Sequence, residues 1–547
     1  LPPQDFNYAP PRLSPEQESA AGALRAKLGR GFSATLLDGV TGSGKTEVYF
    51  AMAAAAVEDP LAQALILLPE IALTSQFLSK FEARFGASPV IWHSAITPAA
   101  RRESFKAIAD GRARIIAGTR SALFLPFKNL AMIALDEEHD ASYKQEDGAV
   151  YNGRDMAVLK AKTEGIPIAL ASATPSLETY KNALDGKYGR IVMSHRFGGA
   201  GLPEIRLVDM RSSGAGKQCW ISDQLGAAIS QALADKEQVM LYINRRGYAP
   251  LVLCGACGHR IGCPNCSTYL SAHSLANLRT TCHYCGHTAR LPLACPECGR
   301  QGEWILCGPG VERIEEEVGR KFPGARTAII SSDEITSPSR LYEIVRSIES
   351  RETDIVIGTQ IIAKGHHFPS LTLVGAIDGD MSLAGGNLRA NEATFQILTQ
   401  VSGRSGRGDA KGRVYIQTFN PQNPVMQAIA RGDRDGFLAA ELAARKEANM
   451  PPFSKLAAVI LTSKDKGALE SHARAMAAAA PRGVEGIACH GPIDAPLAQI
   501  QKQHRKRFLI VADKGARVQG VIAKWTAMVP PPSSVRVKID IDPYSFL

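Results

Sequence analysis

Eight consecutive residues match the pattern of a phosphate-binding loop: Gly39, Val40, Thr41, Gly42, Ser43, Gly44, Lys45 and Thr46. They lie between a predicted strand at residues 34–37 and a predicted helix. The backbone N–H groups of the glycine-rich turn and the N-terminus of that helix all favour an anion. Lys45 is expected to reach the β- and γ-phosphates, and the hydroxyl of Thr46 to ligate Mg²⁺. The loop therefore predicts a site for ATP with Mg²⁺.

An acidic group follows another apolar strand, predicted over residues 132–135. Asp136 and Glu137 open the sequence DEEH at the point where that strand ends. A carboxylate there can hold Mg²⁺ at the edge of a sheet. We therefore expect Asp136 to face the metal and Glu137 to orient or deprotonate the attacking water. The alternative is a charged loop after a buried strand, but the phosphate-binding loop upstream favours the catalytic interpretation.

Two arginines lie late in the chain, within the sequence QVSGRSGR at positions 400–407. Arg404 and Arg407 are three residues apart, a spacing that puts both on one face of a helix. We expect them to reach the γ-phosphate bound by the other lobe, where arginines stabilise the charge of the transition state. Ordinary surface arginines would not need the flanking Gln400 and Gly403.

Eight cysteines form four Cys-x-x-Cys pairs within 45 residues: Cys254/Cys257, Cys263/Cys266, Cys282/Cys285 and Cys295/Cys298. Four such pairs can supply ligands for two tetrahedral Zn²⁺ sites. With four sulfur ligands and no open position, each zinc would be structural. The alternative is a disulfide framework, which is typical of secreted proteins. This chain starts without an apolar signal segment, so a reducing cytoplasm is expected.

The four pairs can share two metals in three ways. Fifteen residues separate Cys266 from Cys282, a spacing that fits a zinc ribbon made by the two inner pairs. The outer pairs, Cys254/Cys257 and Cys295/Cys298, would then close around it. We favour this nested arrangement over a crossed one, and the spacing leaves the other pairings open.

Composition sets broad limits. The 547 residues are enough for three or four domains, and 45% hydrophobic with 21% charged residues is ordinary for a globular protein. The formal net charge of +10 and the pI near 9.0 favour polyanionic partners without identifying one. No apolar run is long enough to predict a membrane segment. The chain begins at Leu1 without an initiator Met, which favours a fragment of a longer protein.

Apolar strands alternate with helical stretches, which predicts an α/β fold with parallel, helix-covered sheets. A helix is expected over residues 14–30, with strands at 34–37, 64–68, 115–117, 132–135 and 168–170. A second series has strands at 239–243, 355–357, 373–377 and 414–417, and a last strand is expected at 535–541. We divide the chain into a first lobe (1–200), a second lobe (201–448) with a cysteine insertion (251–306), and a C-terminal domain (449–547).

These segments resemble the PriA family (primosomal protein N′) of bacterial replication-restart helicases, which belongs to superfamily 2. The resemblance runs from about residue 12 to the end of the chain. It rests on the eight cysteines and on these motifs: GVTGSGKTEVY from Gly39, LLPEIALTSQ from Leu67, GTRSALFLPFKNL from Gly118, DEEHDASYKQEDG from Asp136, SATPS from Ser172, NRRGYAP from Asn244, GTQIIAKGHHFP from Gly358 and QVSGRSGR from Gln400. It implies two RecA-like parallel-sheet lobes, a two-zinc insertion in the second lobe, and a small C-terminal α/β domain.

The resemblance implies further roles, position by position. Gln17 would read adenine, and Ser172 with Thr174 would couple hydrolysis to movement of the lobes. The residues expected near the DNA backbone are Thr119, Arg120, Arg245, Thr359 and Lys364. The stretch 143–154, with Tyr143 and Tyr151, resembles an aromatic-rich loop that senses single-stranded DNA. Ala149 stands where the family usually carries Trp.

The implied function is an ATP-dependent 3′-to-5′ DNA helicase that acts at stalled or collapsed replication forks and initiates primosome assembly. Expected partners are branched and single-stranded DNA, single-stranded DNA-binding protein and primosome proteins, for a cytoplasmic monomer without membrane contact. The family's N-terminal DNA-binding region has no counterpart in this sequence.

Two other interpretations stay open. One is a zinc-bearing primosome assembly platform with a weak or vestigial motor. The other is an RNA helicase or restriction-type translocase with the same motor. Five intact motor residues argue against the first: Lys45, Asp136, Glu137, Arg404 and Arg407. The eight cysteines and the terminal domain argue against the second.

Overall fold

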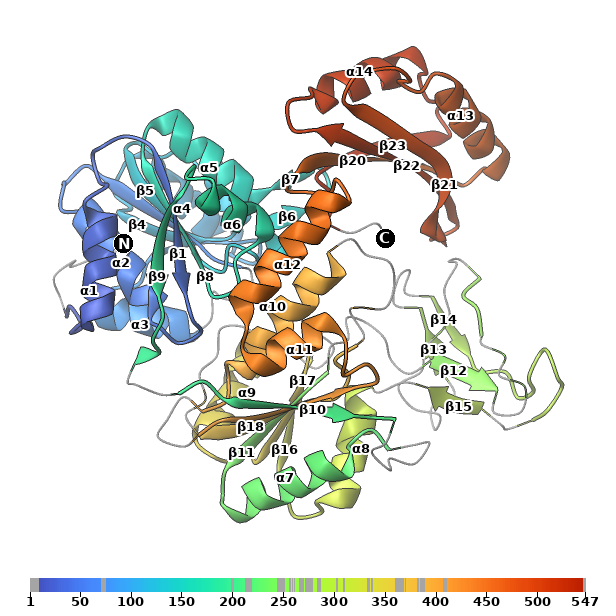
Figure 1. Cartoon of the computed structure of the whole chain (residues 1–547), viewed down its shortest axis with the longest axis horizontal. Helices are drawn as coiled ribbons and strands as arrows, with labels where there is room; N and C mark the ends of the chain where they lie inside the picture. The colour runs from blue at the N-terminus through green and yellow to red at the C-terminus, as the bar shows by residue number, and fades with distance from the viewer. Residues whose placement is uncertain are drawn as a thin grey trace.

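Two helix-covered parallel sheets, a cysteine block and a C-terminal domain make up the molecule (Figure 1). The computed structural model describes residues 9–69, 75–197, 201–211, 219–243, 251–254, 257, 259, 261–264, 270, 279–282, 287–301, 304–307, 310–331, 335, 338–359, 368, 370–380, 383, 389–406 and 411–544.

The first lobe is built on a parallel sheet of seven strands in the order β3-β4-β2-β5-β8-β1-β9. In chain order they are β1 (Ser33–Gly39), β2 (Gln63–Leu67), β3 (Val90–Trp92), β4 (Ile115–Gly118), β5 (Leu130–Leu135), β8 (Pro167–Ser172) and β9 (Gly189–Met193). The five central strands are apolar and buried on both faces, which is typical of a parallel sheet covered by helices. All five lie within two residues of their predicted ranges. The edge strands β3 and β9 were not predicted.

Helices cover both faces of this sheet. One apolar cluster joins the sheet to α1 (Pro15–Arg25), α2 (Lys45–Ala56) and α3 (Ser75–Phe85), and the opposite cluster joins it to α4 (Pro98–Ala109) and α5 (Gly153–Glu164). Between β5 and α5 the chain forms a one-turn 3-10 helix, η3 (Ala141–Tyr143), and a short hairpin of β6 (Lys144–Gln145) and β7 (Tyr151–Asn152). Another 3-10 helix, η2 (Arg120–Phe124), follows β4.

The first helix begins where the sequence predicts. Ser14 accepts from the backbone N–H of Gln17, and the Gln17 side chain accepts from the backbone N–H of Ser14, which makes a reciprocal cap. The helix ends at Arg25, so the predicted end at residue 30 is wrong. Gly29 and Gly31 adopt φ of +69° and +85°, a left-handed conformation in which an α-helix does not continue.

The second lobe has a parallel sheet of six strands in the order β10-β19-β18-β11-β17-β16. In chain order they are β10 (Glu204–Asp209), β11 (Gln238–Tyr242), β16 (Thr327–Ile330), β17 (Ile355–Gly358), β18 (Leu371–Ala376) and β19 (Arg413–Thr418). One face packs against α7 (Asp223–Ala234) and α8 (Val311–Lys321). The other face packs against α9 (Pro338–Glu349), α10 (Ala390–Ser402), α11 (Pro424–Arg431) and α12 (Arg434–Glu447).

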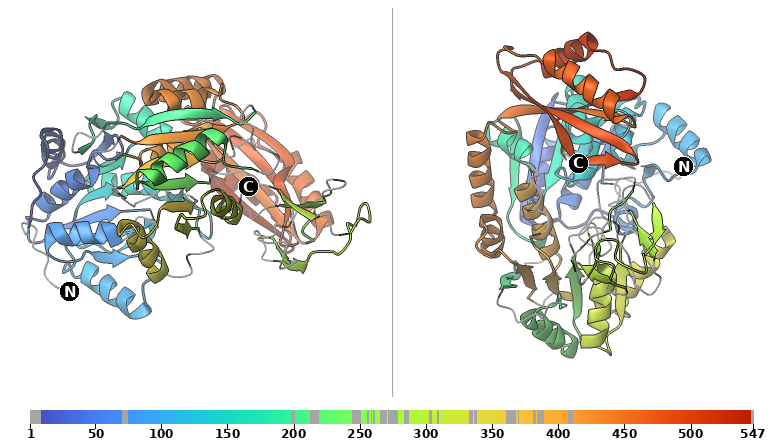
Figure 2. Two further views of the ribbon diagram at one scale, coloured as in Figure 1. Left: turned by 90° about the horizontal axis from the view of Figure 1, so that it is seen from below. Right: turned by 90° about the vertical axis from the view of Figure 1, so that its right-hand side faces the viewer.

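The cysteine block is inserted between β11 and α8 and stands to one side of the second lobe (Figure 2). It contains two antiparallel pairs, β12 (Leu251–Cys254) with β15 (Trp304–Cys307), and β13 (Arg279–Thr281) with β14 (Thr288–Arg290).

The C-terminal domain is an antiparallel sheet in the order β21-β22-β20-β23, with two helices on one face. Its elements are β20 (Ser454–Ser463), α13 (Lys466–Ala478), β21 (Ile487–Ile500), β22 (Gln503–Asp513), α14 (Val518–Met528) and β23 (Val535–Ile541). The predicted fold class is therefore confirmed: α/β, with two parallel-sheet lobes, a cysteine cluster in the second and a small C-terminal α/β domain.

The two lobes meet along α6 (Leu177–Leu184). Leu177 and Tyr180 of this helix belong to the apolar cluster of the second lobe, in which Phe395 and Phe437 stack at 4.1 Å between ring centroids. Asp38, fully buried at the end of β1, pairs with Arg190 of the first lobe (2.6 Å) and with Arg434 of the second (2.5 Å). The junction thus combines apolar packing with an ion pair that crosses between the lobes.

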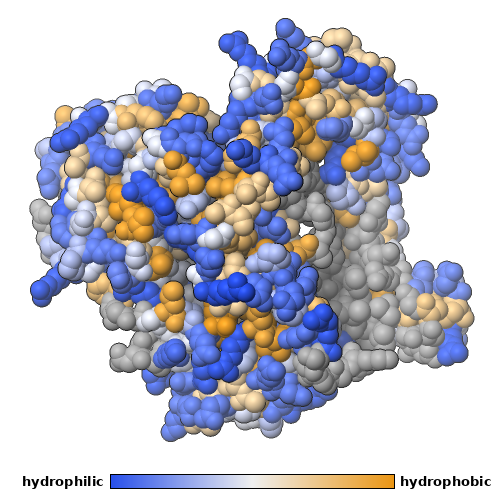
Figure 3. Space-filling model, viewed as in Figure 1, coloured by the Kyte–Doolittle hydropathy of each residue, from blue (hydrophilic) through white to orange (hydrophobic). Residues whose placement is uncertain are grey.

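Hydrophobic residues are interspersed among hydrophilic ones over the face drawn in Figure 3. Among the described residues, no helix is both long enough and apolar enough to cross a bilayer.

Candidate ATP site and metal centre

The phosphate-binding loop joins the end of β1 to the start of α2. Gly42 and Gly44 adopt φ of +86° and +82°, the left-handed region that favours glycine. The Nζ of Lys45 donates to the carbonyls of Gly39 (2.8 Å) and Val40 (3.3 Å). The ammonium is therefore held over the loop by backbone acceptors, close to the N-terminus of α2, where an anion is favoured.

Gln17 joins α1 to this loop. Its Nε2 donates to the carbonyl of Ser43 at 2.9 Å, while its Oε1 accepts from Ser14. A Cβ added at Gly44 would lie 2.2 Å from that Nε2, so a larger residue there would displace the amide. The side chain is 2% exposed and lies beside the phosphate loop.

Asp136 and Glu137 follow β5 at the adjacent strand end. Asp136 accepts from the hydroxyl of Tyr49 at 3.1 Å, and the hydroxyl of Tyr143 donates to the Asp136 backbone carbonyl at 2.7 Å. Burial, and then the neighbouring Glu137, raise the pKa of Asp136 to about 6. Glu137 has a φ of +45°, which a residue with a side chain rarely adopts and which is often found at functional sites.

A pocket of about 510 Å³ brings these groups together between the lobes. Its walls include, from the first lobe, Gln17, Thr41, Gly42, Gly44, Lys45, Thr46, Asp136 and Glu137, and from the second lobe, Gln400 and Arg404. Gly39, Val40 and Ser43 are not among its lining residues. Motifs separated by more than two hundred residues in sequence thus share one cavity.

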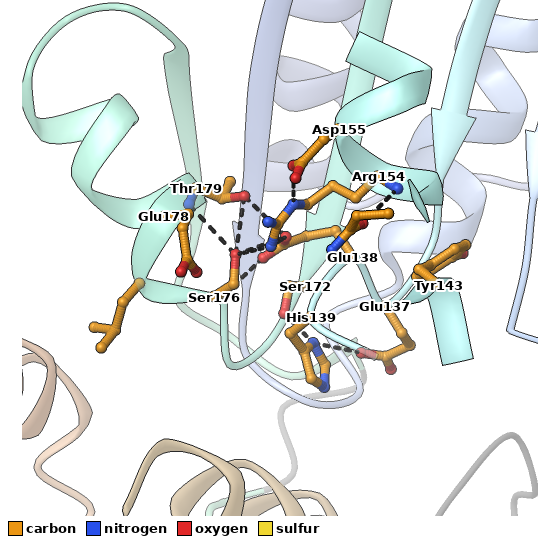
Figure 4. A network of polar contacts seen from close by, with 12 residues as sticks. Glu137, Glu138, His139, Tyr143, Arg154, Asp155, Ser172, Ser176, Glu178 and Thr179 are labelled. Atoms are coloured by element: carbon orange, nitrogen blue, oxygen red, sulfur yellow. Dashed lines mark hydrogen bonds and ion pairs between the residues drawn. The ribbon is translucent and has the colours of Figure 1, made fainter. Parts of the chain in front are cut away.

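His139 connects the acidic group with Gln400 of the second lobe. Figure 4 shows its contacts with Ser172 and Glu137 in the first lobe. Its Nε2 lies 2.8 Å from the amide nitrogen of Gln400, so the amide donates to it and the ring proton sits on Nδ1. That Nδ1 lies 2.7 Å from Oγ of Ser172 and 3.7 Å from the carboxylate of Glu137. Ser172 in turn accepts from the backbone N–H of Thr174 at 3.0 Å. A movement of Gln400 with the second lobe would therefore change the hydrogen bonding of His139 next to Glu137.

Glu138 points away from the pocket into the first lobe (Figure 4). It accepts from the backbone N–H of Ser176 (2.7 Å) and the hydroxyl of Thr179 (2.8 Å), and it lies 3.5 Å from Arg154. Burial raises its pKa, although Arg154 acts to lower it. Glu138 thus fixes the end of β5 to α5 and α6, a structural role that the sequence pattern did not suggest.

Arg404 reaches the pocket from a turn, so the predicted placement of Arg404 and Arg407 on one helix face is wrong. The helix α10 ends at Ser402, and Gly403 caps it. Gly406 then adopts a φ of +66°, which directs the chain away from the helix axis. Arg407 lies outside the described residues.

The turn that carries Arg404 packs directly on the phosphate loop. A Cβ added at Gly403 would lie 2.7 Å from Cγ2 of Thr41, so the backbone of the turn lies directly against the Thr41 side chain. Arg404 is 7% exposed, and burial lowers its pKa to about 10, while Glu137 acts to raise it. Arg196 of the first lobe donates to carbonyls of the same turn, including that of Gly406 at 3.2 Å. The guanidinium of Arg404 is therefore held, buried, against the pocket of the other lobe.

Four cysteine sulfurs meet in the cysteine block: Cys254, Cys257, Cys295 and Cys298. All four lie within 4.8 Å of one another, and the Cys254–Cys298 and Cys257–Cys295 pairs are 3.7 Å apart. Zn–S bonds of 2.3 Å in a tetrahedron give S···S edges of about 3.8 Å. The geometry and the all-thiol donor set fit Zn²⁺, and these are the two outer pairs of the nested arrangement.

The inner set is only partly described. Cys263 and Cys282 are buried and share a small cluster with Leu270, while Cys266 and Cys285 lie outside the described residues. A second zinc site therefore stays a prediction.

Residues 14–183 match the DEAD/DEAH box helicase family, and residues 446–544 match the primosomal protein N C-terminal domain. The chain is 44% identical over 543 residues to the replication restart protein PriA of Rickettsia felis, covering 99% of this chain and 82% of that one. The chain belongs to the replication restart protein PriA family. It is also 35% identical to the Bacillus subtilis PriA, over 98% of this chain and 67% of that one.

Among solved structures, the structure of RecG bound to three-way DNA junction is similar at a TM-score of 0.48 and 15% identity, covering 82% of this chain and 50% of that chain. A likeness this distant decides nothing about function.

Several residues to which the PriA resemblance assigns DNA contact or coupling are buried. Thr119 is 3% exposed and Thr174 is 1% exposed, so neither side chain is open to a ligand in this conformation. Tyr143 is buried against the acidic group, with its hydroxyl donating to backbone carbonyls of Asp136 and Leu67. These residues lie where they can transmit a change to the ATP site, and their roles stay proposals.

Arg120 of η2 contacts the β6–β7 hairpin, Tyr151 lies within it, and both residues are half-buried. Arg120 donates to the carbonyl of Lys144 at 3.1 Å and to that of Ser142, which holds the start of the hairpin. Tyr151 packs edge-to-face on Phe124, 5.2 Å between centroids, and Phe124 is 59% exposed. Thr359 is half-buried directly after β17. Arg245 and Lys364 lie outside the described residues.

Proposed function

We propose that this chain is an ATP-dependent DNA helicase that moves 3′-to-5′, acts at stalled or collapsed replication forks and initiates primosome assembly. The observation that carries the proposal is the pocket in which Lys45, Asp136 and Glu137 of the first lobe face Gln400 and Arg404 of the second. A nucleotide in that pocket would touch both lobes, so its hydrolysis would change how the lobes sit together.

Each group in the pocket has a separate task in hydrolysis. Lys45 would bind the β- and γ-phosphates, and Gln17 would contact the adenine. Glu137 would orient the attacking water and accept its proton as the new oxygen–phosphorus bond forms and the bond to the bridging oxygen breaks. Arg404 would neutralise charge on the transferring phosphoryl group. Arg407 is proposed for the same task because it belongs to the same QVSGRSGR motif.

Mg²⁺ fits the carboxylate of Asp136. Burial and Glu137 both oppose its negative charge, and a divalent cation with oxygen ligands would relieve that cost. When bound, Mg²⁺ supplies positive charge that polarises the phosphate oxygens. Tyr49 and Tyr143 hold the carboxylate and its backbone in position for this task.

The lobes would communicate through His139 and its contacts with Ser172 and Gln400. We assign Thr119, Arg120, Tyr151, Thr359, Arg245 and Lys364 to the DNA side, and Tyr143, Ser172 and Thr174 to coupling. The exposed Phe124 beside Tyr151 supports single-stranded DNA as the ligand there, since base stacking on aromatic rings contributes about 1–3 kcal/mol per base.

We extend the proposal to two structural Zn²⁺, one for each nested set of cysteines, and to the division of the chain at residues 200, 251–306 and 449. Branched and single-stranded DNA, single-stranded DNA-binding protein and primosome proteins are the partners proposed for a cytoplasmic monomer. The support is membership in the PriA family, together with the sulfur cluster.

The test compares nucleic acids on the same preparation. ATP hydrolysis is measured alone, with single-stranded DNA and with RNA of the same sequence, and unwinding is measured on duplexes with a 3′ or a 5′ single-stranded tail. We expect stimulation by DNA above RNA and unwinding only from the 3′ tail. Stronger stimulation by RNA would favour the RNA helicase interpretation. Binding of forked DNA without any hydrolysis would favour the assembly platform.

A further inference from the structure

Lys144 is a buried lysine that the ATP site does not use. Its side chain is 1% exposed, and its Nζ lies 2.7 Å from a carboxylate oxygen of Asp540. The same nitrogen donates to the backbone carbonyls of Ile541 (2.7 Å) and Asp542 (3.0 Å). The ammonium thus donates two hydrogen bonds and makes one ion pair, and all three partner groups come from the C-terminal domain, nearly four hundred residues away in sequence. Because an unpaired buried ammonium is costly, this lysine stays buried only while that domain is docked.

A second contact lies at the other strand of the same hairpin. The Nδ2 of Asn152 donates to the hydroxyl of Tyr544 at 3.0 Å. The Tyr544 ring lies 4.4 Å from the guanidinium of Arg389 in the second lobe, and Arg389 pairs with Glu178 of the first lobe at 2.6 Å. Residues 540–544 therefore touch the hairpin and both lobes at once.

The hairpin is continuous with the ATP site. Tyr143 directly precedes Lys144, and its hydroxyl donates to the backbone carbonyl of Asp136 itself and to that of Leu67. Arg120 holds the intervening backbone through the carbonyl of Lys144. Figure 1 shows β6 and β7 next to β20 at the base of the C-terminal domain. A shift of that domain would thus pull on the segment that positions Asp136.

We propose that Lys144, together with residues 540–544, forms a clamp through which the C-terminal domain positions the Asp136 segment and makes DNA-stimulated ATP hydrolysis depend on that domain's docking. Lys144 is a positioning residue, because it acts through Tyr143 and not on the nucleotide. The inference rests on the proposed helicase function and adds the C-terminal domain to its ATP site.

The first test uses Lys144→Met, which keeps the aliphatic stem and removes the ammonium, in the full chain. We expect the ratio of kcat with single-stranded DNA to kcat without it to fall at least fivefold, with KM for ATP within twofold of wild type. Lys160→Met is the matched control, because Lys160 pairs with Glu164 inside α5 and contacts no other domain through that pair. Asp540→Asn should reproduce the loss, and the double variant should lose no more than Lys144→Met alone. Equal losses with and without DNA, or an unchanged ratio, would overturn the clamp.

The second test does not depend on catalysis. Deuterium uptake is compared by mass spectrometry for peptides that cover residues 134–152 in wild type, Lys144→Met, Lys160→Met and Tyr544→Phe. The last variant removes a single hydroxyl and keeps the ring against Arg389, so it addresses the clamp even if Lys144→Met folds poorly. Faster exchange in this segment for Lys144→Met and Tyr544→Phe, with none for the control, is expected. Unchanged exchange in both variants would refute the clamp. If wild type shows no DNA-stimulated hydrolysis, the helicase proposal is refuted, and the clamp is then tested by the exchange measurement alone.

Discussion

Replacing Arg404 with methionine separates catalysis from stability in this chain. Arg404 is 7% exposed and faces the phosphate pocket from a turn of the second lobe. Burial lowers its pKa from 12.5 to about 10, with Glu137 acting in the opposite direction. Since each pKa unit corresponds to 1.36 kcal/mol, the folded protein without nucleotide bears a cost of about 3 kcal/mol for keeping this guanidinium charged. Methionine is also unbranched and carries no charge, so it removes that cost.

Arg404→Met should therefore lower catalysis without lowering stability. We expect the melting temperature of the nucleotide-free protein to be unchanged or raised. Hydrolysis should fall by about 10³-fold, or about 4 kcal/mol of transition-state stabilisation, since arginines that act on the transferring phosphate are worth that much or more. Affinity for ADP should stay within fivefold, because ADP lacks the phosphate that Arg404 addresses.

Wild type and Arg404→Met are compared by thermal unfolding, steady-state hydrolysis and ADP binding, all measured on one preparation of each protein. Arg206→Met is the matched control, since Arg206 lies exposed on β10 of the same lobe, where it pairs with Glu204 and lies over the Tyr415 ring, and is not among the lining residues of the pocket. A melting temperature that falls by several degrees, with hydrolysis and ADP affinity reduced alike, would show that Arg404 is a structural residue. The reasoning from its burial would then be refuted.

Four further outcomes are expected. Lys45→Ala should abolish hydrolysis, measured as phosphate release, while DNA binding survives; substantial residual activity would put the active site elsewhere. At limiting Mg²⁺, kcat/KM should decline as the pH falls through about 6, because the raised pKa of Asp136 leaves it protonated there, and more Mg²⁺ should move the midpoint lower. The same raised pKa means that the folded state holds an extra proton between pH 3.8, the ordinary pKa of Asp, and about pH 6. The contribution of Asp136 to stability should therefore fall as the pH rises through that window. Measuring the free energy of unfolding against pH for wild type and Asp136→Asn checks the sign. Metal analysis should return two Zn²⁺ per chain, and Cys298→Ser should lose one of them together with protection of β12 and β15 from protease, whereas unchanged zinc content would exclude the sulfur cluster as a site.

The sequence predicted the central strands of both sheets. These strands are rich in apolar residues and largely buried, so each was found within two residues. The edge strands β9 and β10 were missed because one side of each is exposed and their sequences, GRIVM and EIRLVD, mix charges with apolar residues. The phosphate loop and the acidic group were predictable because their chemistry demands fixed spacing over a few residues.

Contacts between segments far apart in the chain could not be predicted from the spacing of residues in the sequence. The end of α10 before Arg404 depends on two glycines whose conformation the flanking pattern does not reveal. The pairing of Gln400 with His139, and of Lys144 with Asp540, joins residues hundreds of positions apart, and nothing local to either partner signals the other. The cysteine pairing differs from these contacts, because the spacing favoured the nested arrangement and the sulfur cluster agrees with it for the two outer pairs.

The ion pair at Asp38 bears on the reversibility of lobe movement. Asp38 has one cationic partner in its own lobe, Arg190, and one in the other lobe, Arg434. In the proposed helicase cycle the lobes part, and Arg434 would then leave while Arg190 stays. The carboxylate would not become a solitary buried charge, a state that costs about 3–5 kcal/mol. In that cycle, Asp38 would have two cationic partners when the lobes are closed and one when they are open. The free-energy difference between the two states would then be small, which suits a junction that must re-form at every turnover.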